Sequence, residues 1–169
     1  AGSGNDQFIV SDPWSDTMFF AGGAGFDILK VDLTGLTSAV SGGFSSNHGA
    51  FTATSYSNSV HILTVVADDV QQVDFTGGEG DDSLSGGLYN DILSGGGGGD
   101  YLYGGAGGDD ILRGGAGNDR LISETGTPWV DGGAGIDFAD IRLSSATQDI
   151  IFDAVAAGSA SGTTLADGT

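Results

Sequence analysis

The chain has no cysteine, so neither a disulfide framework nor a thiolate zinc site can stabilise it. Proline occurs only twice, which excludes collagen-like and proline-rich linker structures. Basic residues are also scarce: one Lys and three Arg stand against 21 Asp and two Glu, giving a formal net charge of −19. We therefore expect no nucleic-acid partner. No apolar run approaches the ~20 residues of a membrane-spanning helix, and the first residues show no signal-peptide pattern.

Glycine and aspartate are abundant instead. The 169 residues include 33 glycines, about one in five, whereas an average soluble domain has roughly 7%. Aspartate favours turns and tight ligand geometry, while a merely solvated acidic surface usually contains more glutamate than the two residues found here. The length predicts one domain, and the composition argues against a helical protein.

A nine-residue repeat begins at residue 77. Its blocks read GGEGDDSLS, GGLYNDILS, GGGGGDYLY, GGAGGDDILR, GGAGNDRLI and, later, GGAGIDFAD; they start at Gly77, Gly86, Gly95, Gly104, Gly114 and Gly132. The fourth block has one extra residue, and an alternative register starts it at Gly105. The segment SETGTPWVD is a decayed unit that has Pro128 where the other blocks have Asp.

Two positions of the repeat, which we number as slots one to nine, are nearly constant. Slot six is Asp82, Asp91, Asp100, Asp109 (Asp110 in the other register), Asp119 or Asp137. Slot eight is apolar: Leu84, Leu93, Leu102, Ile111 or Leu112, Leu121 and Val130. The residues around slot eight form a short strand with one inward side chain, and the glycines before it form a turn.

One nonapeptide buries a single side chain, so units must stack to make a core. Two turns and two strands per 18-residue coil predict an all-β fold, a right-handed parallel β-roll or β-helix solenoid. Blocks of the same parity then stack on one edge: those starting at 77, 95, 114 and 132 on one edge, and those at 86, 104 and 123 on the other.

Stacking brings the slot-six carboxylates to the strand spacing of ~4.8 Å, where like charges repel. A hard divalent cation between successive turns reverses this effect. Calcium accepts six to eight carboxylate and carbonyl oxygens, whereas magnesium demands stricter octahedral geometry. Three intervals on the first edge and one on the second predict about four calcium sites within 77–140, and the interval that faces Pro128 should be weak or empty.

These consecutive GGxGxD blocks resemble the RTX, or hemolysin-type, calcium-binding β-roll of secreted bacterial toxins, metalloproteases, lipases and alginate epimerases. The resemblance implies that slot-six Asp residues bridge ions, and that carbonyls of slots one and three of one turn and slots two and four of the next complete the shell. The residues so implicated, besides the aspartates, are Gly77, Glu79, Gly86, Leu88, Gly95, Gly96, Gly97, Gly98, Gly105, Gly107, Gly114, Gly115, Ala116, Gly117, Gly133 and Gly135. It also implies type I export and folding outside the bacterial cell. Tyr89 in slot four departs from the pattern.

The rest of the chain follows the repeat less closely. Residues 1–30 look like degenerate repeats in which Asp6 and Asp27 either share a further calcium ion or belong to a plain β edge that caps the solenoid. Residues 31–76 form either longer coils or a small antiparallel insertion. Residues 77–140 are the regular roll, and 141–169 are expected to be closing strands and a flexible tail. All four segments belong to one domain.

No catalytic motif is present: HExxH, GxSxG and a P-loop are all absent, so we expect no enzyme activity from this chain. Tyr101 and Tyr103 flank the inward Leu102 and should both face outward, where they either stack against a glycan or cover the sheet. Two functions follow. The first is a monomeric calcium-dependent folding module of a larger secreted bacterial protein. The alternative is a carbohydrate- or surface-binding module, of a polysaccharide-active enzyme or adhesin, in which calcium is structural.

Overall fold

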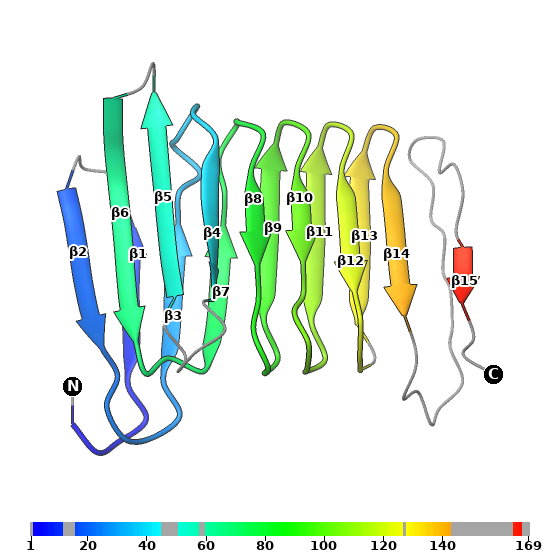
Figure 1. The fold of residues 1–169 in the computed structure, drawn as a ribbon. Helices are drawn as coiled ribbons and strands as arrows, with labels where there is room; N and C mark the ends of the chain where they lie inside the picture. The colour runs from blue at the N-terminus through cyan, green and yellow to red at the C-terminus, as the bar shows by residue number, and fades with distance from the viewer. Residues whose placement is uncertain are drawn as a thin grey trace.

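The computed structural model describes residues 2–11, 16–44, 51–57, 60–126, 128–142 and 164–166, and their regular structure is entirely β. Six parallel strands form one sheet, here called sheet A (Figure 1). Its order is β1 (Gln7–Ser11), β3 (Ile28–Asp32), β7 (Gln72–Thr76), β9 (Ile92–Gly97), β11 (Ile111–Ala116) and β13 (Trp129–Ala134). The strands follow one another along the sheet in chain order, as the coils of a solenoid must.

Sheet B faces sheet A and contains the other nine strands. Its order is β15 (Thr164–Ala166), β14 (Phe138–Arg142), β12 (Arg120–Ser123), β10 (Tyr101–Tyr103), β8 (Ser83–Ser85), β4 (Val40–Phe44), β5 (Phe51–Ser57), β6 (Val60–Asp68) and β2 (Asp16–Ala21). From β7 to β14 the chain alternates strictly between the sheets. The predicted all-β parallel solenoid is therefore confirmed, with about six coils.

The coils stack in register, so each slot-eight residue lies beside its equivalent. Leu84 pairs with Leu102 and Leu102 with Leu121 in sheet B. In sheet A, Leu93 pairs with Leu112, which pairs with Val130. The five leucines are at most 1% exposed, and full burial of such a side chain stabilises the fold by roughly 1.5–3 kcal/mol. This column is the core of the regular roll.

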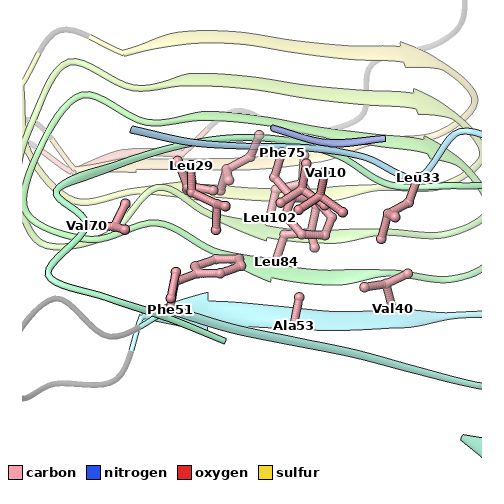
Figure 2. Packing of buried hydrophobic residues seen from close by; sticks show 14 of the residues in the cluster. Val10, Leu29, Leu33, Val40, Phe51, Ala53, Val70, Phe75, Leu84 and Leu102 are labelled. Carbon is pink, nitrogen blue, oxygen red and sulfur yellow. The ribbon is translucent and has the colours of Figure 1, made fainter. Parts of the chain in front are cut away.

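The segment between β3 and β7 is an antiparallel insertion that is built into the solenoid. Strands β5 and β6 pair antiparallel, β5 also pairs antiparallel with β4, and β6 lies parallel to β2. The hairpin thus separates β2 from β4 in sheet B, while β1 and β3 remain neighbours in sheet A. Larger side chains fill this part of the core: the rings of Phe51 and Phe75 lie 5.8 Å apart, and Figure 2 shows both beside Leu84.

The ends of the described chain continue the stack. Residues of β1 pair in register with those of β3, so the degenerate N-terminal repeats form the first coil. At the other end β15, which lies in the segment expected to be a flexible tail, pairs with β14 in parallel. The remaining residues beyond Arg142, which include most of the expected closing strands and tail, lie outside the described part of the chain.

Candidate metal sites in the stacked turns

The turns gather at two edges of the roll. At edge 1 the chain passes from sheet A to sheet B, through residues 33–39, 77–82, 95–100, 114–119 and 132–137. At edge 2 it passes from sheet B to sheet A, and the described residues there are 22–27, 69–71, 86–91, 104–110, 124–126 and 128. The predicted parity of the blocks is thus the parity found.

Each slot-six carboxylate reaches back to the coil before it. Its Oδ1 accepts the backbone N–H of the preceding slot-six residue: Asp100 from Asp82 at 2.7 Å, Asp119 from Asp100 at 2.8 Å, Asp137 from Asp119 at 3.0 Å, and, on edge 2, Asp110 from Asp91 at 3.0 Å and Asp27 from Asp6 at 2.8 Å. Where the preceding coil has no such residue, Asp82 accepts from Val40 and Asp91 from Val73. The aspartates therefore form one ladder along each edge.

The second oxygen of most of these carboxylates has no partner. Oδ2 is buried and without a hydrogen bond in Asp27, Asp100, Asp110 and Asp119. All four residues are at most 2% exposed. A buried carboxylate oxygen without a partner costs several kcal/mol, since it has lost its water. The turns thus present aligned negative oxygens for which the protein supplies no counter-charge.

The glycine in slot one leaves space beside Oδ2 of the Asp in its own turn, whether that Oδ2 is unpartnered, as in Asp119, or accepts a backbone N–H, as Asp82 does from Gly78 and Asp91 from Gly87. A Cβ added to Gly77 would collide with Oδ2 of Asp82 and with the carbonyl of Gly95. The same pair of groups, the Oδ2 of the turn's own Asp and the carbonyl of the next slot-one glycine, surrounds Gly86 and Gly114. A carboxylate and a carbonyl oxygen that converge on one point are the donors that a hard cation such as calcium takes. The residues present therefore fit calcium.

In the third and fifth blocks, slots two and four need glycine for a different reason. Gly96 and Gly98 have φ of +112° and +110°, and Gly115 and Gly117 have +117° and +140°. Side chains rarely adopt these conformations. Slot three has no such constraint and holds Ala116 in one block.

Burial and like charge perturb the ladder electrostatically. Desolvation raises the pKa of Asp91 to about 6. Desolvation, with the neighbouring carboxylates adding to it, raises the pKa of Asp100 and of Asp110 to about 7. The pKa values of Asp82 and Asp119 are raised as well, chiefly because they are buried. Removing charge from these turns, by protons or by a bound cation, is therefore favourable.

The structure selects one of the two registers for the fourth block. Asp110 is 1% exposed and lies in the ladder, and Leu112, two residues later, is buried in the core. Asp109 is exposed instead and donates its backbone N–H to Oδ1 of Asn90 at 2.9 Å. The extra residue of this block lies between Gly105 and Gly108, both of which have positive φ.

Slot five carries a second ladder that the sequence analysis missed. Asn or Asp in this slot accepts the backbone N–H of the slot-five residue of the following coil: Asn5 from Phe26, Asp81 from Gly99, Asn90 from Asp109 and Asn118 from Ile136, at 2.7–3.0 Å. Here the accepting side chain lies in the earlier of the two coils, whereas in the slot-six ladder it lies in the later coil. The preference for Asn or Asp at slot five in five blocks (Asn5, Asp81, Asn90, Asp109 and Asn118) was the available signal.

The edge-2 ladder stops at the decayed unit. Gly126 lies against the carbonyl of Gly108 and Val130 pairs with Leu112, so slots four and eight are kept as predicted. Pro128 supplies no carboxylate at slot six. Among the described residues no three His, Asp or Glu side chains gather at one point, so an ion in any turn must take most of its oxygens from carbonyls and water.

The two candidate glycan-stacking residues lie on β10. Tyr101 is 43% exposed, and it pairs in register with Arg120 of β12. Tyr103 is half-buried, and its hydroxyl donates to a carboxylate oxygen of Glu124 at 2.9 Å. The Tyr101 side chain is therefore accessible at the surface of sheet B, whereas Tyr103 is half-buried and its hydroxyl is bound to Glu124.

Parallel coils joined by glycine turns with a carboxylate in each turn define a β-roll. Residues 76–109 and 106–139 match the family model of the RTX calcium-binding nonapeptide repeat (4 copies). The chain therefore contains RTX calcium-binding repeats, which are typically structural rather than catalytic and typical of secreted bacterial proteins. The match covers less than half of the chain, and a search of curated proteins gave no match. The described residues contain no helix long and apolar enough to cross a membrane.

Proposed function

We propose that this chain is a calcium-dependent folding module within a larger secreted bacterial protein. The observation that carries the proposal is the set of buried, unpartnered Oδ2 atoms of Asp27, Asp100, Asp110 and Asp119. Each lies at a turn where a glycine leaves room for a cation. Type I export, in an unfolded form, and an extracellular location accord with the RTX repeats.

Folding on calcium binding follows from the electrostatics of the ladder. Without calcium, ionised carboxylates repel one another at the coil spacing, and the many glycines carry a high chain entropy. With calcium, the binding free energy becomes folding free energy, because the unfolded chain has no preformed site. The calcium-free module should therefore be largely unfolded at neutral pH.

We propose about four calcium sites in the regular roll. Three lie on edge 1, between the turns that contain Asp82, Asp100, Asp119 and Asp137. One lies on edge 2, between the turns of Asp91 and Asp110. Asp100, Asp110 and Asp119 would bind through their unpartnered Oδ2 atoms, and the remaining donors are the carbonyls of slots one to four. A further ion is proposed near Asp6 and Asp27.

A calcium titration followed by far-UV circular dichroism tests the proposal. The spectrum in chelator should be that of a disordered chain, and calcium should restore the β signal whereas magnesium should not. A full β signal in chelator contradicts the proposal. Light scattering of the calcium-loaded chain tests the accompanying expectation of a monomer, and we propose no catalytic role.

The second candidate function is carbohydrate or cell-surface binding, with calcium only structural. It is favoured by the exposure of Tyr101 on the outer face of sheet B, close to Tyr103. Aromatic rings of this kind stack on sugar rings. Glycan-array binding that is lost in Tyr101→Ala and Tyr103→Ala, with an unchanged calcium-loaded fold, would support it; no binding by the wild-type chain would remove it.

A further inference from the structure

The turn 22–27 faces a turn that does not belong to any nonapeptide. Its neighbour on edge 2 is the turn 69–71, by which the chain leaves the β5–β6 hairpin and enters β7. The first turn reads GGAGFD and the second DVQ. Both lie outside the segment matched to the RTX repeat.

Asp27 is the acid of the first turn, and it is completely buried. Its side chain is 0% exposed. Oδ1 accepts the N–H of Asp6 at 2.8 Å, and the Asp27 N–H donates to Oε1 of Gln71 at 2.7 Å. Oδ2 has no hydrogen-bond partner. A carboxylate in this position needs a positive charge beside its free oxygen, since water does not reach it.

Asp69 supplies a second oxygen at the same point. A Cβ added to Gly22 would collide with Oδ2 of Asp27 and with the carbonyl oxygen of Asp69. Gly114 has the same surroundings, made by Oδ2 of Asp119 and the carbonyl of Gly132. The Asp69 carbonyl thus takes the place that a slot-one glycine carbonyl has in the regular roll.

The backbone conformation of Asp69 directs its carbonyl oxygen toward Gly22. Its φ is +55°, and it is the one non-glycine residue with positive φ in the described part of the chain. Such a conformation costs of order 1 kcal/mol for a residue with a side chain. The turn is held against its neighbour, because Gly22 donates its N–H to the Asp68 carbonyl at 2.8 Å and Gln71 donates to the Asp27 carbonyl at 3.0 Å.

We propose that these two turns hold a calcium ion of their own, bound by Oδ2 of Asp27 and the main-chain carbonyl of Asp69. The choice of calcium rests on the proposed function. Of the two turns only the first, GGAGFD, follows the nonapeptide pattern, and the second, DVQ, does not. This ion is the further one proposed above near Asp6 and Asp27, and the site places it on the Asp69 side of Asp27 rather than between the two aspartates. The first block has Ala rather than Gly in slot one. The ion links the turn 69–71, which follows the β5–β6 hairpin, to the turn 22–27, which precedes β3.

Counting bound calcium per chain by native mass spectrometry tests the site. Asp27→Asn keeps the shape and the Oδ1 acceptor but removes the charge, and it should lose one calcium ion per chain. Asp32→Asn, at an exposed acid at the other end of β3, the strand that follows Asp27, should lose none. Asp100→Asn should also lose at least one ion, from the regular roll. An unchanged count in Asp27→Asn beside a reduced count in Asp100→Asn overturns this site alone, whereas a wild-type chain without calcium overturns the proposed function.

Hydrogen exchange of the wild-type chain and of Asp100→Asn tests the site even if Asp27→Asn does not fold. Calcium should slow exchange of the Gly22 and Gln71 amides, which join the two turns. In Asp100→Asn, where the regular roll is weakened, the slowing should persist because the ion is local. Two results would overturn the proposal. Calcium could leave the exchange of amides 22–28 and 70–73 unchanged, or these amides could lose their protection together with the roll in Asp100→Asn.

Discussion

Replacing Asp100 by Asn should change the stability of the roll in opposite directions with and without calcium. Asp100 lies in the middle of the edge-1 ladder, is 2% exposed, and accepts the Asp82 N–H at 2.7 Å. Asn is almost the same size, and its Oδ1 keeps that hydrogen bond. The substitution therefore removes one negative charge and little else.

The magnitude follows from the pKa of Asp100. Burial raises it from 3.8 to about 7. At about 1.4 kcal/mol for each tenfold change, the ionised carboxylate costs the calcium-free roll at most about 4 kcal/mol at alkaline pH. Relaxation of the turn and the high effective dielectric constant of protein sites reduce this to about 2 kcal/mol, which Asp100→Asn should recover. With calcium at about 100 times its dissociation constant, losing one site should cost about 3 kcal/mol.

Two unfolding experiments measure these effects. In chelator at about pH 8, where the wild-type chain is expected to be unfolded, folding is driven by trimethylamine N-oxide, and the variant should fold at a lower concentration. In saturating calcium, urea should unfold the variant at a lower concentration than the wild type. Asp32→Asn, an exposed acid, serves as the control for charge alone. A variant that is destabilised in both solutions would refute the electrostatic argument.

Three further predictions follow from the same structure. Because the pKa values of Asp91, Asp100 and Asp110 are raised to about 6 or 7, the calcium-free roll binds more protons than the unfolded chain between about pH 4 and pH 7. The stability of the calcium-free roll should therefore be highest in acid and fall as the pH rises through 6 to 7. Circular dichroism in chelator should show more β structure at about pH 5 than at about pH 8. The affinity for calcium should instead rise with pH, since calcium binds the ionised form. Gly96→Ala should destabilise the calcium-loaded roll by about 3 kcal/mol or more in urea, because φ is +112° and the new Cβ meets the Gly78 carbonyl, while Gly97→Ala meets only the end of the Glu79 side chain and should be nearly neutral. Leu102→Ala, at a fully buried position, should lose about 2–5 kcal/mol in the same assay, and Tyr101→Ala on the outer face much less.

The regular roll was predictable from the sequence because its rule is local and repeated. A carboxylate every nine residues followed two residues later by an apolar side chain specifies a turn, an inward strand and a stacking partner at once. Leu84, Leu102 and Leu121 pair as that rule requires. Even the decayed unit kept Gly126 and Val130 in their predicted slots, since stacking on intact neighbours constrains it from both sides.

The insertion could not be predicted in the same way. Its strands alternate apolar and polar residues, a pattern that fits both a longer coil and a hairpin, and only the pairing of β5 with β4 and β6 separates the two. The role of the Asp69 carbonyl was also hidden, because it depends on a positive φ in a turn without a motif. For the fourth block, the choice between Asp109 and Asp110 depended on which residue the neighbouring coil could bury.

The hairpin makes the two sheets unequal in width. Sheet B has two strands between β4 and β2, where sheet A has none between β3 and β1, and at about 4.8 Å per strand this leaves an overhang of about 10 Å. Figure 1 shows β2 lying beyond β1 at this end of the molecule. Met18 and Phe20 of β2 pack on the core yet remain only half-buried, because no sheet A strand lies fully opposite them. Thermal motion should open the roll first at this overhang, as a unit separate from the leucine column, and a binding partner that covered it would extend cooperative unfolding to the whole solenoid.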